Sequence, residues 1–142
     1  MVDQGKLDSM LSNLRTYVQV LRRLAAVPRE VFLADLDKLG SAKYHFVIAI
    51  ECCIDIGNHI VASERFRIPR DNADVFVVLV ENGICQTDLE PSLRAMARFR
   101  NRLVHLYWEV DDELLRTYLQ ESLDDFDRFA AAVGQERNGS QG

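Results

Sequence analysis

Proline and glycine, the residues that most often interrupt a helix, are scarce in this chain. It has three prolines and seven glycines in 142 residues. Apolar residues recur at helical spacing, and no segment shows the alternation that marks a half-buried strand. The sequence therefore predicts an all-α protein, an up-and-down bundle of four to five helices.

An excess of basic residues and a long apolar run are also missing. Seventeen Lys and Arg face 22 Asp and Glu, for a net charge of -5. This balance argues against a protein that coats nucleic acid by general charge attraction, so any RNA contact should be local. The longest apolar run, residues 46–50, is too short to span a membrane, and the first residues contain no apolar leader. We expect a cytoplasmic protein that does not contact a membrane.

The cysteines and the usual site motifs give no sign of a cofactor. Cys52, Cys53 and Cys85 form no C-x-x-C pair, and their odd number indicates reduced, packed thiols. A Gly-rich phosphate loop, a G-x-S-x-G elbow and an H-E-x-x-H pair are all absent from the sequence. Its three histidines are too scattered to indicate a metal site, so we predict neither metal nor cofactor.

Turn and capping residues divide the chain into predicted helices. The expected main helices are 3–26, 42–64, about 72–82, about 91–107 after a capping box at 87–90, and 112–133 after Asp111, and a short additional helix could cover 29–36. The inward side of the last helix should consist of Leu115, Leu119, Phe126, Phe129 and Val133. Residues 135–142 are polar and contain glycine, so we expect one helical domain, 1–134, and a disordered tail.

The most informative segment is 98–107, RFRNRLVHLY, which concentrates arginine, asparagine, histidine and tyrosine in an acidic chain. At about 100° per residue, one face of its helix carries Arg94, Arg98, Asn101, Arg102 and His105. The opposite side carries Met96, Phe99, Leu103 and Leu106, which should face the core. Arginine and histidine together can hold a phosphate and move a proton beside it, which suits RNA cleavage without a metal.

Arg100 falls outside this cationic face, at about 140° from His105 on a straight helix. Either the helix breaks before His105, or Arg100 acts at an interface where a second protomer supplies its partner. The helix at 42–64 carries a polar stripe made of Tyr44, Glu51, Asp55, Asn58 and His59. Glu51 or Asp55 could orient Arg98, Arg102 or His105, although both polar faces could equally be ordinary solvent-exposed surfaces.

The eight residues from Arg100 to Tyr107 resemble the R-x4-H-x-Y motif of HepT-type ribonuclease toxins, which belong to the HEPN superfamily. Asn101, directly after the arginine, also fits the general pattern of that superfamily. The similarity extends over about residues 5–133, and its clearest parts outside the motif are 53–60, 68–69, 81–84 and 110–111.

This resemblance implies an all-helical homodimer that cuts RNA without a metal, with the motif helices meeting at a cleft. It assigns catalysis to Arg100, Asn101 and His105. It also implies a partner, a nucleotidyltransferase antitoxin of the MntA type, which silences the toxin by adenylylating the motif tyrosine, here Tyr107. Arg98 and Arg102 are assigned to substrate binding from their position alone.

In such a reaction the RNA 2′-OH attacks the neighbouring phosphate and leaves a 2′,3′-cyclic phosphate. The sequence leaves the RNA target open, together with two other functions. One is a catalytically inactive HEPN module that binds a nucleotidyltransferase partner or a nucleotide. The other is a helical adaptor with an arginine patch on its surface.

Overall fold

The computed structural model describes the backbone of residues 2–141 and the side chains of residues 2–134. Its α-helices are α1 (Gln4–Ala25), α2 (Arg29–Leu33), α3 (Leu36–Ser63), α4 (Asn72–Glu81), α5 (Glu90–His105), α6 (Asp112–Glu121) and α7 (Leu123–Gln141). Two short 3-10 turns, η1 (Thr87–Leu89) and η2 (Tyr107–Glu109), flank α5. The described residues contain no strand, and the predicted all-α fold is confirmed.

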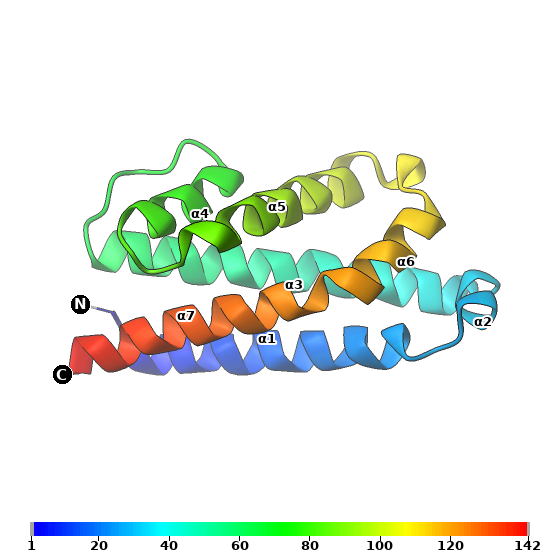
Figure 1. Cartoon of the computed structure of the whole chain (residues 1–142), viewed down its shortest axis with the longest axis horizontal. Coiled ribbons are helices and arrows are strands. Elements are labelled where there is room, and N and C mark those ends of the chain that lie inside the picture. Colours follow the sequence, from blue (N-terminus) through cyan, green and yellow to red (C-terminus); the bar gives the residue numbers. More distant parts are fainter. Residues whose placement is uncertain (1, 142) are drawn as a thin grey trace.

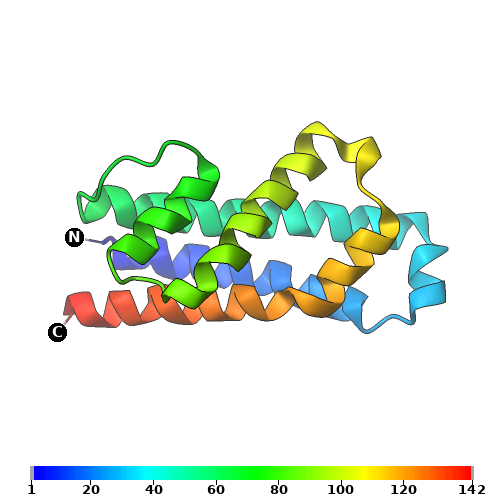
Figure 2. The same cartoon turned by 45° about the horizontal axis from the view of Figure 1, so that its top comes forward.

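The helices form a bundle around α3 (Figure 1). The long helices α1 and α3 run antiparallel, and α7 lies along α1 so that both termini reach the same end of the molecule (Figure 1). Helices α4 and α5 pack side by side on α3 and cross it obliquely (Figure 2). The short α2 and the turn η2 therefore lie at the end opposite the termini.

Aspartate caps explain where four of the helices begin. Asp3, Asp35, Asp71 and Asp111 each accept a backbone N–H from the first turn that follows. The cap at Asp111 confirms the prediction. The cap at Asp35 corrects another one, since α3 begins at Leu36 rather than near residue 42 and absorbs the end of the segment predicted as 29–36.

Two further boundaries differ from the predicted ones. The capping box predicted at 87–90 does not form, because these residues make the turn η1 and α5 begins without a side-chain cap. The last predicted helix is broken at Ser122 into α6 and α7. The disordered tail and the domain limit at residue 134 stay predictions, because the side chains of residues 135–142 lie outside the described ones.

An aromatic cluster fixes α5 against the rest of the bundle. The rings of Phe46 and Phe99 meet edge to face at 5.4 Å between centroids, and Phe99 stacks on Tyr118 at 4.0 Å. Phe126 completes the cluster from α7, at 6.4 Å from Phe46. The predicted inward residues of the last helix are confirmed, since Leu115, Leu119, Phe126, Phe129 and Val133 are at most 1% exposed.

Two features hold α4 against α3. A Cβ atom on Gly57 would lie 2.5 Å from Cγ1 of Val75, so the two helices approach at a distance that only glycine permits. In the loop between the helices, Arg67 donates to both oxygens of the buried Asp74, at 2.7 and 3.0 Å, and also to Glu81. These bonds hold the pKa of Asp74 well below its usual range.

The three cysteines are buried and free, as predicted. Loss of hydration raises the pKa of Cys52 and that of Cys85 to about 11, and the pKa of Cys53 also lies well above its usual value. All three are therefore protonated, packed thiols at neutral pH.

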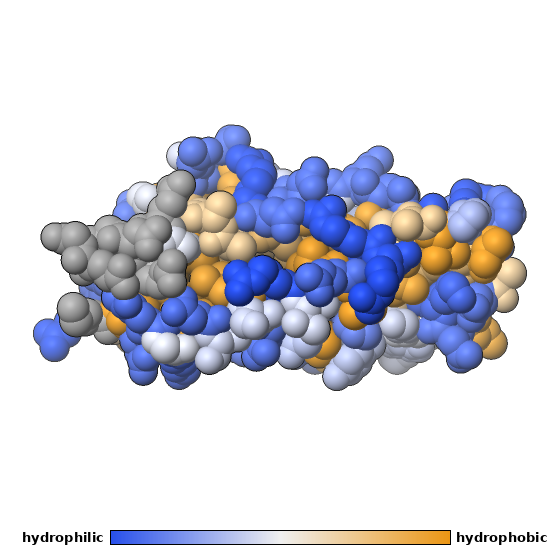
Figure 3. Space-filling view, turned by 90° about the horizontal axis from the view of Figure 1, so that it is seen from below, coloured by the Kyte–Doolittle hydropathy of each residue, from blue (hydrophilic) through white to orange (hydrophobic). Residues whose placement is uncertain are grey.

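Helix α3 is the one described helix that is long and apolar enough to cross a membrane, and 56% of its most apolar window is buried inside the fold. Its contacts with α1, α4 and α5 account for this composition. On the α1–α7 side, rows of hydrophilic side chains flank a strip of apolar surface (Figure 3). A groove on this side is lined by side chains of α1 and α7, among them Val18 and Phe126.

Candidate active site at the end of helix α5

The motif occupies the last turns of α5 and the turn that follows. The helix continues through His105, and Leu106 then leaves the helical conformation with φ -130° and ψ 42°. The helix therefore does not break before His105, and it ends two residues earlier than predicted. Leu106 is 38% exposed rather than buried, because the backbone turns away from the core at this residue.

Arg100 is held by two side chains of its own protomer. Its Nη2 and Nε donate to Oε1 of Glu51, at 2.8 and 3.2 Å, and its Nη1 donates to Oδ1 of Asn101 at 3.1 Å. The Arg100 side chain is only 19% exposed. Since Nη1 and Nη2 each carry two N–H groups, one donor on each remains available for two oxygens of a phosphate.

The polar stripe of α3 thus meets the motif at a different arginine from those we expected. Glu51 contacts Arg100, because this arginine lies on the side of α5 that faces α3, whereas Arg98, Arg102 and His105 point away. Within residues 2–134, no hydrogen bond or ion pair joins Asp55, one turn further on, to α5. Partial loss of hydration, and then the charge of Glu51, raise the pKa of Asp55, while Lys6 of α1 lowers it.

Other members of this stripe have structural or solvent-facing positions. The Nε2 atom of His59 accepts the backbone N–H of Asp3 at 3.2 Å and so supports the start of α1. Tyr44 and Asn58 are exposed. The stripe is therefore only locally connected to the motif, through Glu51.

The predicted cationic face of α5 is present and open to solvent. All five of its residues are exposed: Arg94, Arg98, Asn101, Arg102 and His105. Within residues 2–134, none of its three arginines forms an ion pair. Several arginines elsewhere in the chain do pair with carboxylates, namely Arg22, Arg29, Arg67, Arg70 and Arg128, whereas Arg15, Arg23 and Arg65 form no ion pair within the same residues. The positive charge of this face is therefore not neutralised locally.

Tyr107 lies on the turn η2 with its side chain accessible. It is 52% exposed, and the neighbouring Trp108 is 76% exposed, so neither is packed in the core. Nζ of Lys43 lies 4.5 Å from the centre of the Tyr107 ring and 3.7 Å from Oδ1 of Asp112. Sequence reasoning missed Lys43, because nothing near it in the chain connects it with the motif.

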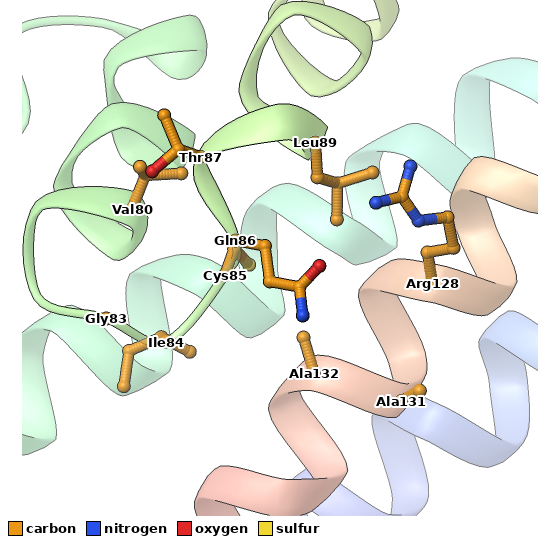
Figure 4. Close-up of a pocket in the computed structure, with 10 residues that line it drawn as sticks. All are labelled: Val80, Gly83, Ile84, Cys85, Gln86, Thr87, Leu89, Arg128, Ala131 and Ala132. Atoms are coloured by element: carbon orange, nitrogen blue, oxygen red, sulfur yellow. The ribbon is translucent and has the colours of Figure 1, made fainter.

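A separate hollow of about 650 Å³ lies between the loop at residues 83–89 and α7 (Figure 4). Its one charged lining residue, Arg128, is paired with Asp88 at 2.8 Å. No motif residue lines this hollow, and among residues 2–134 no cluster of three His, Cys, Asp or Glu side chains could hold a metal ion.

Comparison with known families identifies the group to which this arrangement belongs. The family described as "Ribonuclease HepT-like" matches residues 14–133. The chain belongs to the HepT-like ribonuclease family. The resemblance seen in the sequence is thereby confirmed.

Relatives of the HepT-like chain cover nearly its whole length. It is 28% identical to the mRNA nuclease HepT of Shewanella oneidensis over 131 residues, which are 91% of this chain and 98% of the relative. A crystal structure of a toxin–antitoxin with AMP-PNP shares its fold with a TM-score of 0.85, at 23% identity, over 91% of this chain and 97% of that one.

A second solved structure shares the HepT-like fold equally well. It is the tri-AMPylated Shewanella oneidensis HEPN toxin in complex with MNT antitoxin, with a TM-score of 0.84 at 24% identity. The match covers 91% of this chain and 96% of that chain. Both comparisons agree with the helical bundle described above.

Proposed function

We propose that this HepT-like protein is the toxin of a toxin–antitoxin pair and a metal-independent endoribonuclease that acts in the cytoplasm. Arg100, Asn101 and His105 are its catalytic residues. The observation that carries the proposal is the state of Arg100. Glu51 and Asn101 fix its guanidinium, which keeps one free donor on each terminal nitrogen, in a chain whose family is named for ribonuclease activity.

The chemistry follows from these groups. Imidazole can accept and donate a proton near neutral pH, so His105 removes the proton of the RNA 2′-OH or protonates the leaving 5′ oxygen. The two free donors of Arg100 stabilise the charge that develops on the phosphorane, a contribution of roughly 3–4 kcal/mol for a well-placed donor. The products are a 2′,3′-cyclic phosphate and a free 5′-OH.

One protomer does not bring Arg100 and His105 into contact, since they lie on different sides of a continuous helix. We therefore propose a homodimer in which two α5 helices face each other across a cleft. Each protomer then supplies one histidine, which provides one group for each of the two proton transfers. Arg98 and Arg102, both exposed and unpaired within residues 2–134, bind the RNA backbone beside this cleft.

Tyr107 is the proposed point of control by an MntA-type nucleotidyltransferase antitoxin. In one solved structure, the Shewanella oneidensis HEPN toxin is tri-AMPylated and in complex with MNT antitoxin. In the present chain the Tyr107 side chain is half exposed beside the end of α5, where an enzyme can reach it. Adenylate attached there would add negative charge next to the phosphate site and repel RNA.

The deciding experiment is cleavage of total RNA by purified protein in the presence of EDTA, with analysis of the fragment ends. Wild-type protein should leave cyclic phosphates, and His105→Ala and Arg100→Ala should lose this activity while they keep their helical circular dichroism. His59→Gln is the matched control. His59 lies near the C-terminal end of α3, away from the motif, and accepts the backbone N–H of Asp3.

Mass spectrometry must first show that Tyr107 carries no adenylate. If the folded, unmodified wild-type protein leaves RNA intact, the ribonuclease assignment is wrong. The chain would then be a HEPN module that binds a nucleotidyltransferase or a nucleotide.

A further inference from the structure

A groove beside the motif has no role in the reaction described so far. It measures about 530 Å³ and lies between the start of α4 and the middle of α5, two helices that run side by side (Figures 1 and 2). Its lining consists of Asp71, Asn72, Ala73, Arg94, Arg98 and Asn101. Half of these residues come from the cationic face of α5.

The two arginines of the groove lie in a concave lining, which sets them apart from Arg15, Arg23 and Arg65, the exposed arginines on other helices and loops that also form no ion pair within residues 2–134. Arg94 and Arg98 are exposed and have no ion-pair partner within residues 2–134, in a protein with a net charge of -5. They lie one helical turn apart on the same face, so their guanidinium groups can bind successive negative groups of one ligand. Such a concave, unneutralised pair favours an anion with repeated charges.

Asn101 connects the groove with the catalytic arginine. Its Oδ1 atom accepts from Nη1 of Arg100, while the side chain also lines the groove. The amide nitrogen of Asn101 remains a donor that points away from this bond. A chain of phosphates bound along this face of α5 would therefore run from the groove toward His105, and Asn101 would link that face to Arg100.

We infer that this groove is a subsite for single-stranded RNA, which binds the sugar–phosphate backbone several nucleotides away from the cleaved bond. The inference rests on the proposed ribonuclease function and extends it. Arg94 and His105 are about 16 Å apart along α5 by helical rise. The nucleotide bound at the subsite is therefore not the one whose phosphate is cleaved. Arg94 and Arg98 bind phosphates, and the amides of Asn72 and Asn101 donate to phosphate or ribose oxygens.

One residue of the groove opposes this binding. The carboxylate of Asp71 caps α4 by accepting the backbone N–H of Asp74 at 2.8 Å, and its charge repels a phosphate. Asparagine caps helices about as well as aspartate but carries no charge. Asp71→Asn should therefore keep α4 intact and strengthen RNA binding, the opposite of the effect of removing an arginine.

The test measures binding of a fluorescent, mixed-sequence single-stranded RNA oligonucleotide to full-length protein over a range of salt concentrations. The background is His105→Ala, so that the RNA is not cut during the measurement. In this background Arg94→Gln should weaken binding about three- to tenfold. It should also make the dependence of log affinity on log salt shallower, by about 0.7 in the magnitude of its slope. Asp71→Asn should tighten binding, and Arg15→Gln, an exposed arginine on α1, is the matched control.

Cleavage kinetics give a second measurement in proteins that keep His105. Arg94→Gln should raise KM more than it lowers kcat, and the effect should shrink on a substrate too short to reach the groove. If wild-type protein cuts RNA and Arg94→Gln matches Arg15→Gln in affinity, salt slope and KM, the subsite is wrong and the ribonuclease function stands. If no variant binds RNA at all, both fail. An effect of Arg94→Gln only on binding of an acidic protein partner would also overturn the RNA subsite.

Discussion

Arg100 is the residue whose surroundings say most about the chemistry of this chain. Its side chain is only 19% exposed, and three of its N–H groups are used within the protomer. A single charged oxygen of Glu51 binds two of them. This arrangement fixes the plane of the guanidinium and leaves one donor unused on each terminal nitrogen.

Replacing Glu51 tests whether it positions Arg100. Glu51→Gln should lower kcat for RNA cleavage about tenfold, because the neutral amide holds the guanidinium less firmly. Glu51→Ala should lower kcat further, while KM changes less. Asp55→Asn removes the same charge one turn away and should cause a smaller loss. Equal kcat values for Glu51→Gln and wild type, measured in initial-rate assays, would show that Glu51 has no positioning role.

Replacing Arg100 with lysine tests whether the shape of the guanidinium matters in addition to its charge. Arg100→Lys should lose at least about a hundredfold in kcat, since an ammonium group cannot bond Glu51 along one edge and a phosphate with two parallel donors. Thermal melting of the variant should stay close to that of the wild type. A Lys variant with near-normal turnover would indicate that only the positive charge at this position matters.

Tyr107 can be tested separately from catalysis. Tyr107→Phe keeps the ring that Lys43 covers but removes the hydroxyl that would carry adenylate. The variant should cut RNA at about the wild-type rate and remain toxic when the nucleotidyltransferase is co-expressed, whereas the wild type is silenced. Growth measurements and intact-protein mass spectrometry check both points. Silencing of the Phe variant with adenylate on another residue would contradict the assignment.

At the scale of the helices, the packing of α4 on α3 decides where the groove lies. Two glycines of α3 provide a matched pair to test it. A Cβ at Gly57 would meet Val75, which is itself buried, whereas a Cβ at Gly40 would meet nothing within 4 Å.

Gly57→Ala should destabilise the fold by about 1–3 kcal/mol, because Val75 cannot move without disturbing α4. Gly40→Ala should be neutral or stabilising by up to about 1 kcal/mol, since alanine favours a helix more than glycine does. Urea denaturation gives both free energies of unfolding. A Gly57→Ala protein as stable as Gly40→Ala would mean that the helices are not in such close contact.

The loop that joins these helices depends on the charge of Asp74. Its pKa is lowered by bonds from Arg67 and then by the backbone N–H of Arg70, so the carboxylate binds protons less readily in the folded chain than in the unfolded one. Its contribution to stability is therefore complete above the unfolded pKa, about 4, and is lost as the pH falls through the lower folded value.

Asp74→Asn should accordingly lower the free energy of unfolding by about 1–3 kcal/mol at neutral pH. The difference from wild type should shrink as the pH drops below about 4. Denaturant titrations at a series of pH values measure it. A difference that does not change with pH would show that hydrogen bonding alone, and not the charge of Asp74, stabilises this loop.

At the scale of the whole molecule, the separation of Arg100 from His105 is the reason for proposing a second protomer. If the two histidines share one cleft and each serves one proton transfer, a heterodimer of wild-type and His105→Ala chains should have almost no activity. If each protomer had its own independent site, the heterodimer would keep about half of the wild-type activity. Differently tagged chains, co-expressed and purified through both tags, provide this heterodimer, and wild type paired with Arg15→Gln is the control.

The sequence alone was enough to predict the helices, most of their ends and the exposed face of α5. Amphipathic spacing and capping act within a few residues of the chain, so they suffice to identify the cap at Asp111, the inward side of the last helix and the order of the motif residues. Local rules failed at three places: at Asp35, whose cap starts α3 earlier than expected, at residues 87–90, where a 3-10 turn forms and no side chain caps α5, and at Ser122, where one helix became two.

Only the tertiary structure decided which distant side chains meet. The pairing of Glu51 with Arg100, the position of Lys43 over Tyr107 and the groove between α4 and α5 all depend on how helices cross. Spacing along one helix specifies a face, but the angle and offset between two packed helices select the residue that this face contacts. That is why the sequence predicted a contact between Glu51 and the motif helix but placed it at Arg98, Arg102 or His105 instead of Arg100.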